Sequence, residues 1–284
     1  MYPSTLMCEI LNVSSSGYYD ALRRPPSERA QRRQRIDEQV REVYDEHGGI
    51  YGSWKIAEVM AERHELESAC RNTVAAAMKK LGLQSKVSKG FVPTTTHVDP
   101  DKRPAQNVLA QDFAAEAPNR KWVADITYLP TQAGWVYLAT VMDCFSRRIV
   151  GWSLGESLAT ELVSDALRMA IETRRPEGGE LLHHSDRGSQ YTSDAYRQTL
   201  STLGITCSMS RTGCCYDNSM MERFYWSLKY EWTNHEKYVD AADARLSVFK
   251  YIEVFYNRKR IHQALGYVSP EQYEADHAPA TKVA

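Results

Sequence analysis

The spacing of hydrophobic residues predicts alternating strands and helices from Gln106 onward. Runs that are rich in β-branched and aromatic residues, or short and apolar, predict five strands: Trp122–Leu129, Val136–Met142, Arg148–Ser153, Leu181–Asp186 and Ile205–Met209. Apolar residues three and four apart predict helices at Thr160–Arg174, Ser193–Leu203 and Ala241–Tyr256, and another after the capping residues Asp217, Asn218 and Ser219. Short turns make the first three strands antiparallel neighbours, whereas intervening helices favour parallel crossovers for the later strands. The pattern predicts an α/β domain with a mixed sheet flanked by helices.

The first part of the chain carries helical patterns only. Residues 1–24 predict two very short helices, too small to bury a core unaided, and Pro25 and Pro26 end this unit. Residues 1–35 form a helical and basic N-terminal segment, whose arginines are either a solvated face or phosphate contacts: Arg29, Arg32, Arg33 and Arg35. From Ile36 to Leu83 three helical patterns follow one another, and the third is capped by Ser68 and ended by Gly82.

Short helices joined by short turns are typical of a helix-turn-helix DNA-binding domain, here residues 36–85, with its last helix in a major groove. A three-helix bundle without a DNA role is the alternative. If the unit binds DNA, the start of the third helix faces bases and its end faces phosphates: Arg71, Asn72, Thr73, Lys79 and Lys80. Residues 86–105, with several Thr and Pro, predict a linker. A core domain at 106–235 and a C-terminal helical tail at 236–284 follow.

Three acidic residues occupy positions from which their carboxylates can converge. Asp125 lies within a strand, Asp186 ends another strand, and Glu222 lies on the flank of the helix that follows Ser219. A single acid in a strand is as easily a satisfied structural residue, but three together are harder to explain in that way. Hard oxygen ligands suit Mg²⁺, which takes few protein carboxylates and leaves positions for phosphate and water. The pattern therefore predicts a magnesium site.

The motifs around these acids resemble those of a known enzyme family. They read W-x-x-D-I-T-Y at Asp125, H-S-D-R-G-S-Q-Y at Asp186 and Y-D-N-S-x-x-E-R-F at Glu222, with 35 residues between the last two acids. In this they resemble the integrase-like core of bacterial transposases, specifically the OrfB product of insertion-sequence-three-type elements, which are related to retroviral integrases. The tripeptide Ile50-Tyr51-Gly52, just before the second helix of the helix-turn-helix unit, is also typical of this family's N-terminal domain. One departure is Cys214, where the family more often has Asn.

The resemblance implies a ribonuclease H-like catalytic core preceded by an all-α helix-turn-helix domain. It implies that Asp125, Asp186 and Glu222 are catalytic and hold two Mg²⁺ ions, for which Mn²⁺ can substitute. It also implies that the enzyme cuts and joins DNA strands at the ends of the insertion sequence, through a circular intermediate. The expected partners are element ends and target DNA, further copies of the chain on that DNA, and an upstream OrfA segment as a frameshift fusion. Asp143 is a rival acid that the family motif leaves outside the catalytic set.

Basic residues near these motifs are candidate DNA contacts. Lys229 shares a helix face with Glu222, although a solvated lysine is the plainer alternative, and Arg187 and Arg223 adjoin two of the acids. Arg258, Arg260 and His262 either bind phosphate or cap the core. A nuclease that cuts without joining, and a DNA-binding regulator without enzyme activity, are the rival functions.

Composition adds few constraints. The formal net charge is −1, which is a weak argument against DNA binding. The argument is weaker still if some of the acids bind metal ions, because a bound ion reverses their local charge. The cysteines form no C-x-x-C pair, so neither a zinc module nor a disulfide framework is predicted: Cys8, Cys70, Cys144, Cys207, Cys214 and Cys215. The chain has neither an apolar run of the roughly 20 residues that a membrane helix needs nor the basic start of a signal peptide. We expect a reduced, cytoplasmic, soluble protein without membrane association.

Overall fold

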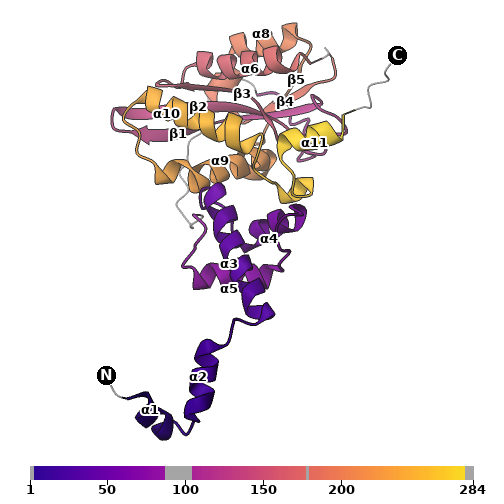
Figure 1. Ribbon diagram of the computed structural model, residues 1–284. Helices are drawn as coiled ribbons and strands as arrows, with labels where there is room; N and C mark the ends of the chain where they lie inside the picture. The colour runs from indigo at the N-terminus through magenta and orange to yellow at the C-terminus, as the bar shows by residue number, and fades with distance from the viewer. Residues whose placement is uncertain (1–2, 87–103, 177–178, 279–284) are drawn as a thin grey trace. The chain divides into compact units, whose positions relative to one another are not determined.

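The computed structural model describes residues 3–86, 104–176 and 179–278, and the chain divides into two compact units, Met1–Ser85 and Lys86–Ala284 (Figure 1). The predicted linker at 86–105 lies almost wholly outside the described residues. Among the described residues, none of the helices has both the length and the apolar character that a bilayer crossing requires.

The first unit is helical, and its core lies between α3 (Glu28–Glu46), α4 (Ser53–Glu62) and α5 (Arg71–Lys80). Its buried residues come from the predicted apolar positions, including Ile36, Val40, Ile56 and Val74. Two predicted boundaries are wrong. The division at 35/36 falls inside α3, because Ser27 caps a helix that includes the whole arginine run.

The predicted cap at Ser68 is the second error, since α5 begins only at Arg71. Arg32 and Arg35 of α3 bind the Glu67 carboxylate at 2.8 and 2.6 Å, and Arg32 also donates to the Ser68 carbonyl. These bonds hold residues 67 and 68 as part of the connection between helices.

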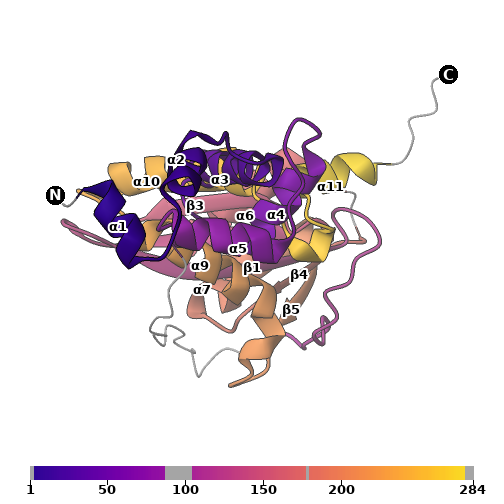
Figure 2. The ribbon, with the colours of Figure 1, turned by 60° about the horizontal axis from the view of Figure 1, so that its bottom comes forward.

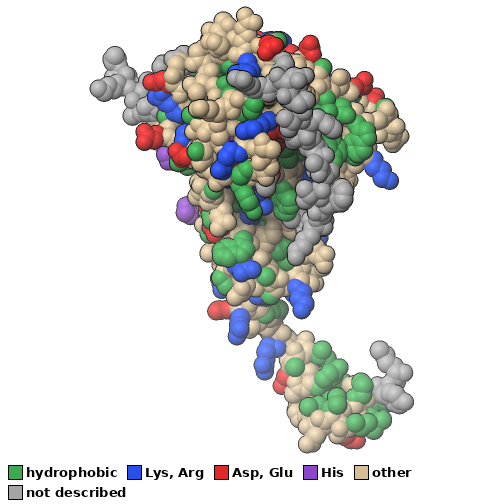
Figure 3. Space-filling model, turned by 180° about the vertical axis from the view of Figure 1, so that it is seen from behind, with side chains coloured by type: hydrophobic (Ala, Val, Ile, Leu, Met, Phe, Trp, Pro, Cys, Tyr) green, Lys and Arg blue, Asp and Glu red, His purple; other side chains and the backbone are tan. Residues whose placement is uncertain are grey.

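The helices α1 (Ser4–Ile10) and α2 (Ser15–Arg23) leave most of their apolar side chains on the surface, as Figure 3 shows. Leu6, Ile10, Leu11 and Leu22 are all exposed, and Cys8 is the buried exception among the apolar side chains of these helices. This segment buries too little apolar surface to supply a core of its own.

The second unit contains a five-stranded mixed sheet in the order β3-β2-β1-β4-β5. The strands are β1 (Lys121–Thr131), β2 (Gly134–Asp143), β3 (Ile149–Gly155), β4 (Leu182–Ser185) and β5 (Thr206–Met209). The first three pair antiparallel, and β1, β4 and β5 pair parallel, as predicted.

Helices cover both faces of this sheet (Figures 1 and 2). One face packs against α6 (Thr160–Arg174) and α8 (Asp194–Thr202) around Trp122 and Val141, and a single-turn helix α7 (Ser189–Thr192), which was not predicted, joins this core. The other face packs against α9 (Ser219–Glu231) and α10 (Ala241–Phe249). The predicted ribonuclease H-like arrangement is thereby confirmed.

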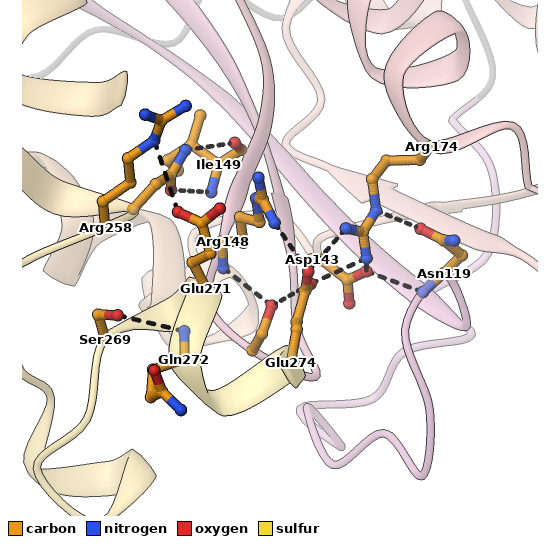
Figure 4. A network of polar contacts seen from close by, with 12 residues as sticks. Asn119, Asp143, Arg148, Ile149, Arg174, Arg258, Ser269, Glu271, Gln272 and Glu274 are labelled. Atoms are coloured by element: carbon orange, nitrogen blue, oxygen red, sulfur yellow. Dashed lines mark hydrogen bonds and ion pairs between the residues drawn. The ribbon is translucent and has the colours of Figure 1, made fainter. Parts of the chain in front are cut away.

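Residues 236–278, the described part of the predicted C-terminal tail, pack on this unit. After α10 comes the π-helical segment η3 (Lys250–Tyr256), and the Asn257 amide bonds both backbone groups of Ile149 at the start of β3. In α11 (Pro270–Asp276), Glu274 accepts bonds from Arg174 at 2.8 Å and from Arg148 at 3.0 Å (Figure 4).

The rival acid Asp143 belongs to the same network. It is fully buried, accepts bonds from the backbone N–H groups of Asn119 and Phe145, and lies 3.3 Å from Arg174 (Figure 4). Its carboxylate oxygens are therefore occupied by structural partners, which agrees with its exclusion from the catalytic set.

Gly151 allows β3 to pack tightly against α6, and its replacement gives a direct test of that packing. A Cβ at this position would lie 2.2 Å from the Ala166 carbonyl oxygen and 2.7 Å from the Ala170 nitrogen. We expect Gly151→Ala to lower the free energy of unfolding by about 1–3 kcal/mol, because backbone must move. Urea denaturation measures this. Gly155→Ala is the matched control, since its nearest contact would be Leu162 Cδ1 at 3.4 Å, and equal losses for the two variants would contradict the argument.

Candidate active site

Two of the three predicted acids lie side by side because of the strand register. Val123 of β1 pairs with His184 of β4 in parallel, and Asp125 and Asp186 each follow two residues later. Neighbouring strands lie about 4.8 Å apart, and positions in parallel register point to the same face. The backbone thus brings Asp125 and Asp186 together at the end of β4. Both side chains are half-buried.

The helix α9 carries the third acid and is fixed to β1 on either side of Glu222. At its start, the Asn218 amide donates to the Ala124 carbonyl at 3.1 Å. Two turns later, the Tyr225 hydroxyl donates to the Asp125 carbonyl at 2.5 Å, and it also lies 2.8 Å from Thr140 Oγ1. The backbone on both sides of the Asp125 side chain is therefore bonded to the helix that presents Glu222.

The surroundings of the site disfavour ionisation of Asp125 and Glu222. Burial raises the pKa of Asp125 well above its usual range, and the negative charges of Asp186 and, less strongly, Glu222 raise it further. The Lys229 ammonium opposes this rise. Burial also raises the pKa of Glu222 and lowers that of Lys229. A group of acids that disfavours its own ionisation is stabilised by a bound cation.

The donors of this site suit a hard divalent cation, since all are carboxylate oxygens. Within the described ranges, however, no three His, Cys, Asp or Glu side chains are close enough together to hold a metal ion as they stand. Asp125 and Asp186 come from the strand pair, whereas Glu222 comes from α9. Its side chain is exposed, so it can turn about its own bonds towards the strand pair without disturbing the core.

Asp217 holds together the loop that leads into α9. It is fully buried and accepts bonds from the side chains of Asn107 and Gln111, and from the backbone and guanidinium of Arg211, at 2.8–3.1 Å. These bonds, above all those from Arg211, hold the pKa of Asp217 far below its usual range. The Cys214 thiol also donates to Asp217, at 3.3 Å. Cys214, which departs from the family motif, is thus part of this hydrogen-bond network.

Three positioning residues were missed by sequence reasoning. Asp217 and Asn218 were interpreted only as helix caps, but neither side chain caps α9. Tyr225 was not among the site residues singled out in the sequence. A tyrosine at a buried position could have indicated this role, because a buried tyrosine hydroxyl needs a hydrogen-bond partner.

Two buried histidines precede Asp186 and support its strand. His184 bonds Ser208 Oγ and Ser210 Oγ at 2.8 and 3.0 Å, and His183 bonds the Tyr196 hydroxyl at 3.1 Å. Burial lowers the pKa of His183 to about 3 and that of His184 to about 4. Both imidazoles are therefore neutral in the folded protein near neutral pH.

These histidines predict a loss of stability in acid. In the unfolded chain their pKa lies near ~6.5, so the unfolded state binds more protons between about pH 6.5 and pH 4, and stability falls as the pH falls through that window. At pH 5 each histidine is expected to cost about 2 kcal/mol relative to pH 7. Urea denaturation of the wild type and of His184→Asn at both pH values measures this, and the variant should lose about 2 kcal/mol less. Identical pH dependence in the two proteins would refute the assignment.

The basic residues near the site are held by neighbouring groups. Lys229 Nζ lies 4.6 Å from the centre of the Tyr128 ring, and the Arg223 guanidinium lies 4.5 Å from the Trp226 ring. Arg187 donates to the Ser210 carbonyl at 2.5 Å and to Thr212 Oγ1 at 2.8 Å. Lys229 is thus held against an aromatic side chain.

The C-terminal basic motif separates into one exposed residue and two buried ones. Arg260 is buried and bonds the Glu231 carboxylate at 2.5 and 2.6 Å, and His262 is buried beside it. Their burial favours the alternative that they cap the core over contact with phosphate. Arg258 is exposed and lies 3.5 Å from Glu271 (Figure 4).

In the first unit, the predicted DNA contacts lie on or near the surface of α5. Arg71, Asn72, Lys79 and Lys80 are exposed, and Thr73 is half-buried. The Arg71 guanidinium lies 4.8 Å from the centre of the Trp54 ring. Lys80 lies 2.6 Å from Asp37, so part of its charge is already neutralised.

Comparison with known proteins identifies both units. The integrase core domain family matches residues 115–215, a second integrase core family matches 203–270, and an HTH-like domain family matches 31–91. A 31 kDa protein of insertion element IS600 from Shigella sonnei is 39% identical over 94% of this chain and 97% of its own length. The transposase InsF of insertion sequence IS3A from Escherichia coli K12 is 40% identical over 94% of this chain and 92% of its own length.

Solved integrase structures are among the matches in three dimensions. The chain aligns with a simian T-cell lymphotropic virus intasome in complex with PP2A regulatory subunit B56 gamma, with a TM-score of 0.49, 13% identity, and coverage of 84% of this chain and 75% of the other. It also aligns with the HTLV-2 integrase catalytic core domain in complex with magnesium, with a TM-score of 0.44, 16% identity, and coverage of 57% and 99%. The sequence relatives, which extend over nearly the whole chain, show that it belongs to the family of IS3-type insertion-sequence transposases with an integrase core domain.

Proposed function

We propose that this transposase cuts and joins DNA strands at a single site formed by Asp125, Asp186 and Glu222. The observation that carries the proposal is the parallel register of β1 and β4, which brings Asp125 and Asp186 together beneath α9. The Asn218 and Tyr225 bonds to the backbone beside Asp125 support it, because they keep the third acid on the same side of the sheet.

The three carboxylates are the residues that would hold Mg²⁺, as two ions, with Mn²⁺ as a substitute. Bound there, the ions would activate the attacking water or 3′-hydroxyl and stabilise the leaving oxygen in an in-line displacement at phosphorus. The chain itself supplies the ligands, their spacing and the surrounding polarity.

The basic residues orient the DNA. Lys229, two turns after Glu222 on the same face of α9, is the candidate to bond a phosphate beside the acids. Arg187 and Arg223 flank the acids in sequence, and exposed Arg258 adds a further positive charge on this unit. In the first unit, the start of α5 would contact bases of the element ends, through Arg71, Asn72 and Thr73. The end of α5 would contact phosphates, through Lys79 and Lys80.

We also propose that the working enzyme contains more than one copy of the chain on DNA, with an upstream OrfA segment fused to it. The exposed apolar residues of α1 and α2 support an added segment at this end, because they are buried by no other described part of their unit.

Two DNA substrates test the joining activity. One duplex contains an intact element end and the other a pre-cut end with a free 3′-hydroxyl, each supplied with Mg²⁺ and target DNA. A joining enzyme gives joined product from both and needs no cleavage step for the second. Hydrolysis of the intact end without joined product from either substrate would show a nuclease instead.

A further inference from the structure

An exposed tryptophan of the first unit holds an arginine at the start of α5. Trp54, near the start of α4, has 55% of its surface exposed. Arg71 is the first residue of α5, and its guanidinium lies over the Trp54 ring, 4.8 Å from the ring centre. The two helices, which also pack against each other, are thus joined at this point by a cation–π contact.

The position of Trp54 on α4 gives it little part in the core of this unit. The buried residues of α4 are Ile56, Val59 and Met60. Successive residues of a helix are rotated by about 100°, so these three lie on one side of α4 and Trp54 lies on the other. An indole with more than half of its surface in water also contributes little hydrophobic free energy. Core packing therefore does not account for a tryptophan at this position.

The outer face of α5 suits close approach to base edges. The side chains that face the core are Val74, Ala77 and Met78. On the opposite side the exposed residues are short in the middle of the helix and polar or basic towards its ends: Asn72, Ala75, Ala76 and Lys79. Short side chains leave room for the helix to enter a major groove, which is only slightly wider than a helix. Arg71 lies one turn before Ala75, at the edge of this face that adjoins Trp54.

The contact with Trp54 leaves the hydrogen-bond donors of Arg71 available. At the far end of α5, Lys80 lies 2.6 Å from the Asp37 carboxylate, which neutralises part of its charge. The Arg71 guanidinium, by contrast, forms no hydrogen bond or ion pair with any residue that the structure describes. An aromatic ring attracts a cation through its face and, unlike a carboxylate, accepts none of its N–H groups in conventional hydrogen bonds. Trp54 therefore restrains the Arg71 side chain without using its donors.

We propose that Trp54 sets the base specificity of the first unit by holding Arg71 against one guanine in the major groove of the element end. The guanidinium fork matches the O6 and N7 acceptors that guanine presents in that groove. A free arginine side chain loses rotamer freedom when it makes such a contact, and a ring that already restrains it lowers that cost. Trp54 is thus a positioning residue, and Arg71 contacts the base. The inference rests on the proposed function, because it takes α5 to bind the element ends.

Binding to base-substituted ends tests the pair. Duplexes of the element end are prepared with each base pair replaced in turn, G·C by A·T and A·T by G·C, and their affinities are measured without divalent ions so that no strand is cut. At one guanine we expect the wild type to lose about 5- to 150-fold in affinity, as for a bidentate arginine–guanine contact. Trp54→Leu should bind the unchanged end about 2- to 30-fold more weakly, the range for a lost cation–π contact, and should discriminate less at that guanine alone.

Matched variants separate positioning from general binding. Arg71→Lys keeps the charge but loses the fork, so it should lose discrimination at the same guanine, and adding Trp54→Leu should cost no further discrimination. Trp54→Tyr and Trp54→Phe keep an aromatic face and should fall between the wild type and Arg71→Lys, which provides the test if Trp54→Leu does not fold. Tyr18→Leu removes an exposed aromatic of α2 in the same unit and should bind every duplex like the wild type.

The outcomes distinguish failure of this inference from failure of the proposed function. If Arg71→Lys loses discrimination at one guanine while all the Trp54 variants keep it in full, only the inference is overturned. A loss spread evenly over all positions in Trp54→Leu, or coupling of the pair at an A·T position, would also overturn it. If Arg71→Lys and Lys79→Ala both bind every duplex like the wild type, α5 does not contact the DNA, and the inference fails together with the proposed role of α5.

Discussion

Asp186→Asn is expected to lower strand joining by about a thousandfold or more while binding of the DNA end persists. The change keeps the shape of the side chain but removes one negative charge from the strand pair that would hold the metal ions. Asp186 also accepts a bond from the Gly188 backbone at 2.9 Å, which the asparagine oxygen can still accept. Fold and DNA contacts are therefore preserved, and only the charge is lost.

Joining assays with a labelled pre-cut end measure the first quantity, and gel-shift titration of the same end measures the second. Asp165→Asn is the matched control, because Asp165 is an exposed carboxylate of the same unit, on α6, where it lies 2.9 Å from Arg168. Joining by Asp186→Asn at a rate similar to that of the control would refute the catalytic assignment.

Arg260→Met is expected to lower the free energy of unfolding by about 3–5 kcal/mol. The change leaves the Glu231 carboxylate buried without its guanidinium partner, and an uncompensated buried charge is strongly destabilising. Methionine keeps much of the apolar volume, so cavity formation contributes little.

Arg258→Met tests the opposite expectation two residues earlier. Arg258 is exposed and its ion pair with Glu271 is long, so its loss should change stability by no more than about 0.5 kcal/mol. Urea denaturation of both variants measures the contrast. Similar small losses for the two variants would mean that Arg260 does not hold Glu231 in the core. Arg260 would then again be a candidate to bind phosphate.

Local patterns predicted the sheet and the position of the acids well. Strand alternation in β1 and β2, the short turn between them and the apolar run before Asp186 depend on nearby residues, and these determine strand direction and order. The approach of Asp125 to Asp186 could be predicted from the same local patterns, since it follows from strand register.

The failures concern contacts between residues far apart in the chain. Arg260 is buried because Glu231 lies 29 positions earlier, and Asn218 reaches the Ala124 carbonyl across 94 positions. The start of α5 was misplaced because Glu67 and Ser68 bind arginines of α3 rather than cap a helix. Side-chain propensity holds no information about such partners, whereas tertiary packing decides them.

We propose that Asp125, Asp186 and Glu222 hold divalent ions jointly, and Mn²⁺ binding measures this directly. Electron paramagnetic resonance titration of the protein–DNA complex should show two bound Mn²⁺ ions per site in the wild type and in Asp165→Asn. Asp125→Asn, Asp186→Asn and Glu222→Gln should each lose at least one of them. Full Mn²⁺ binding by all three variants would contradict the account.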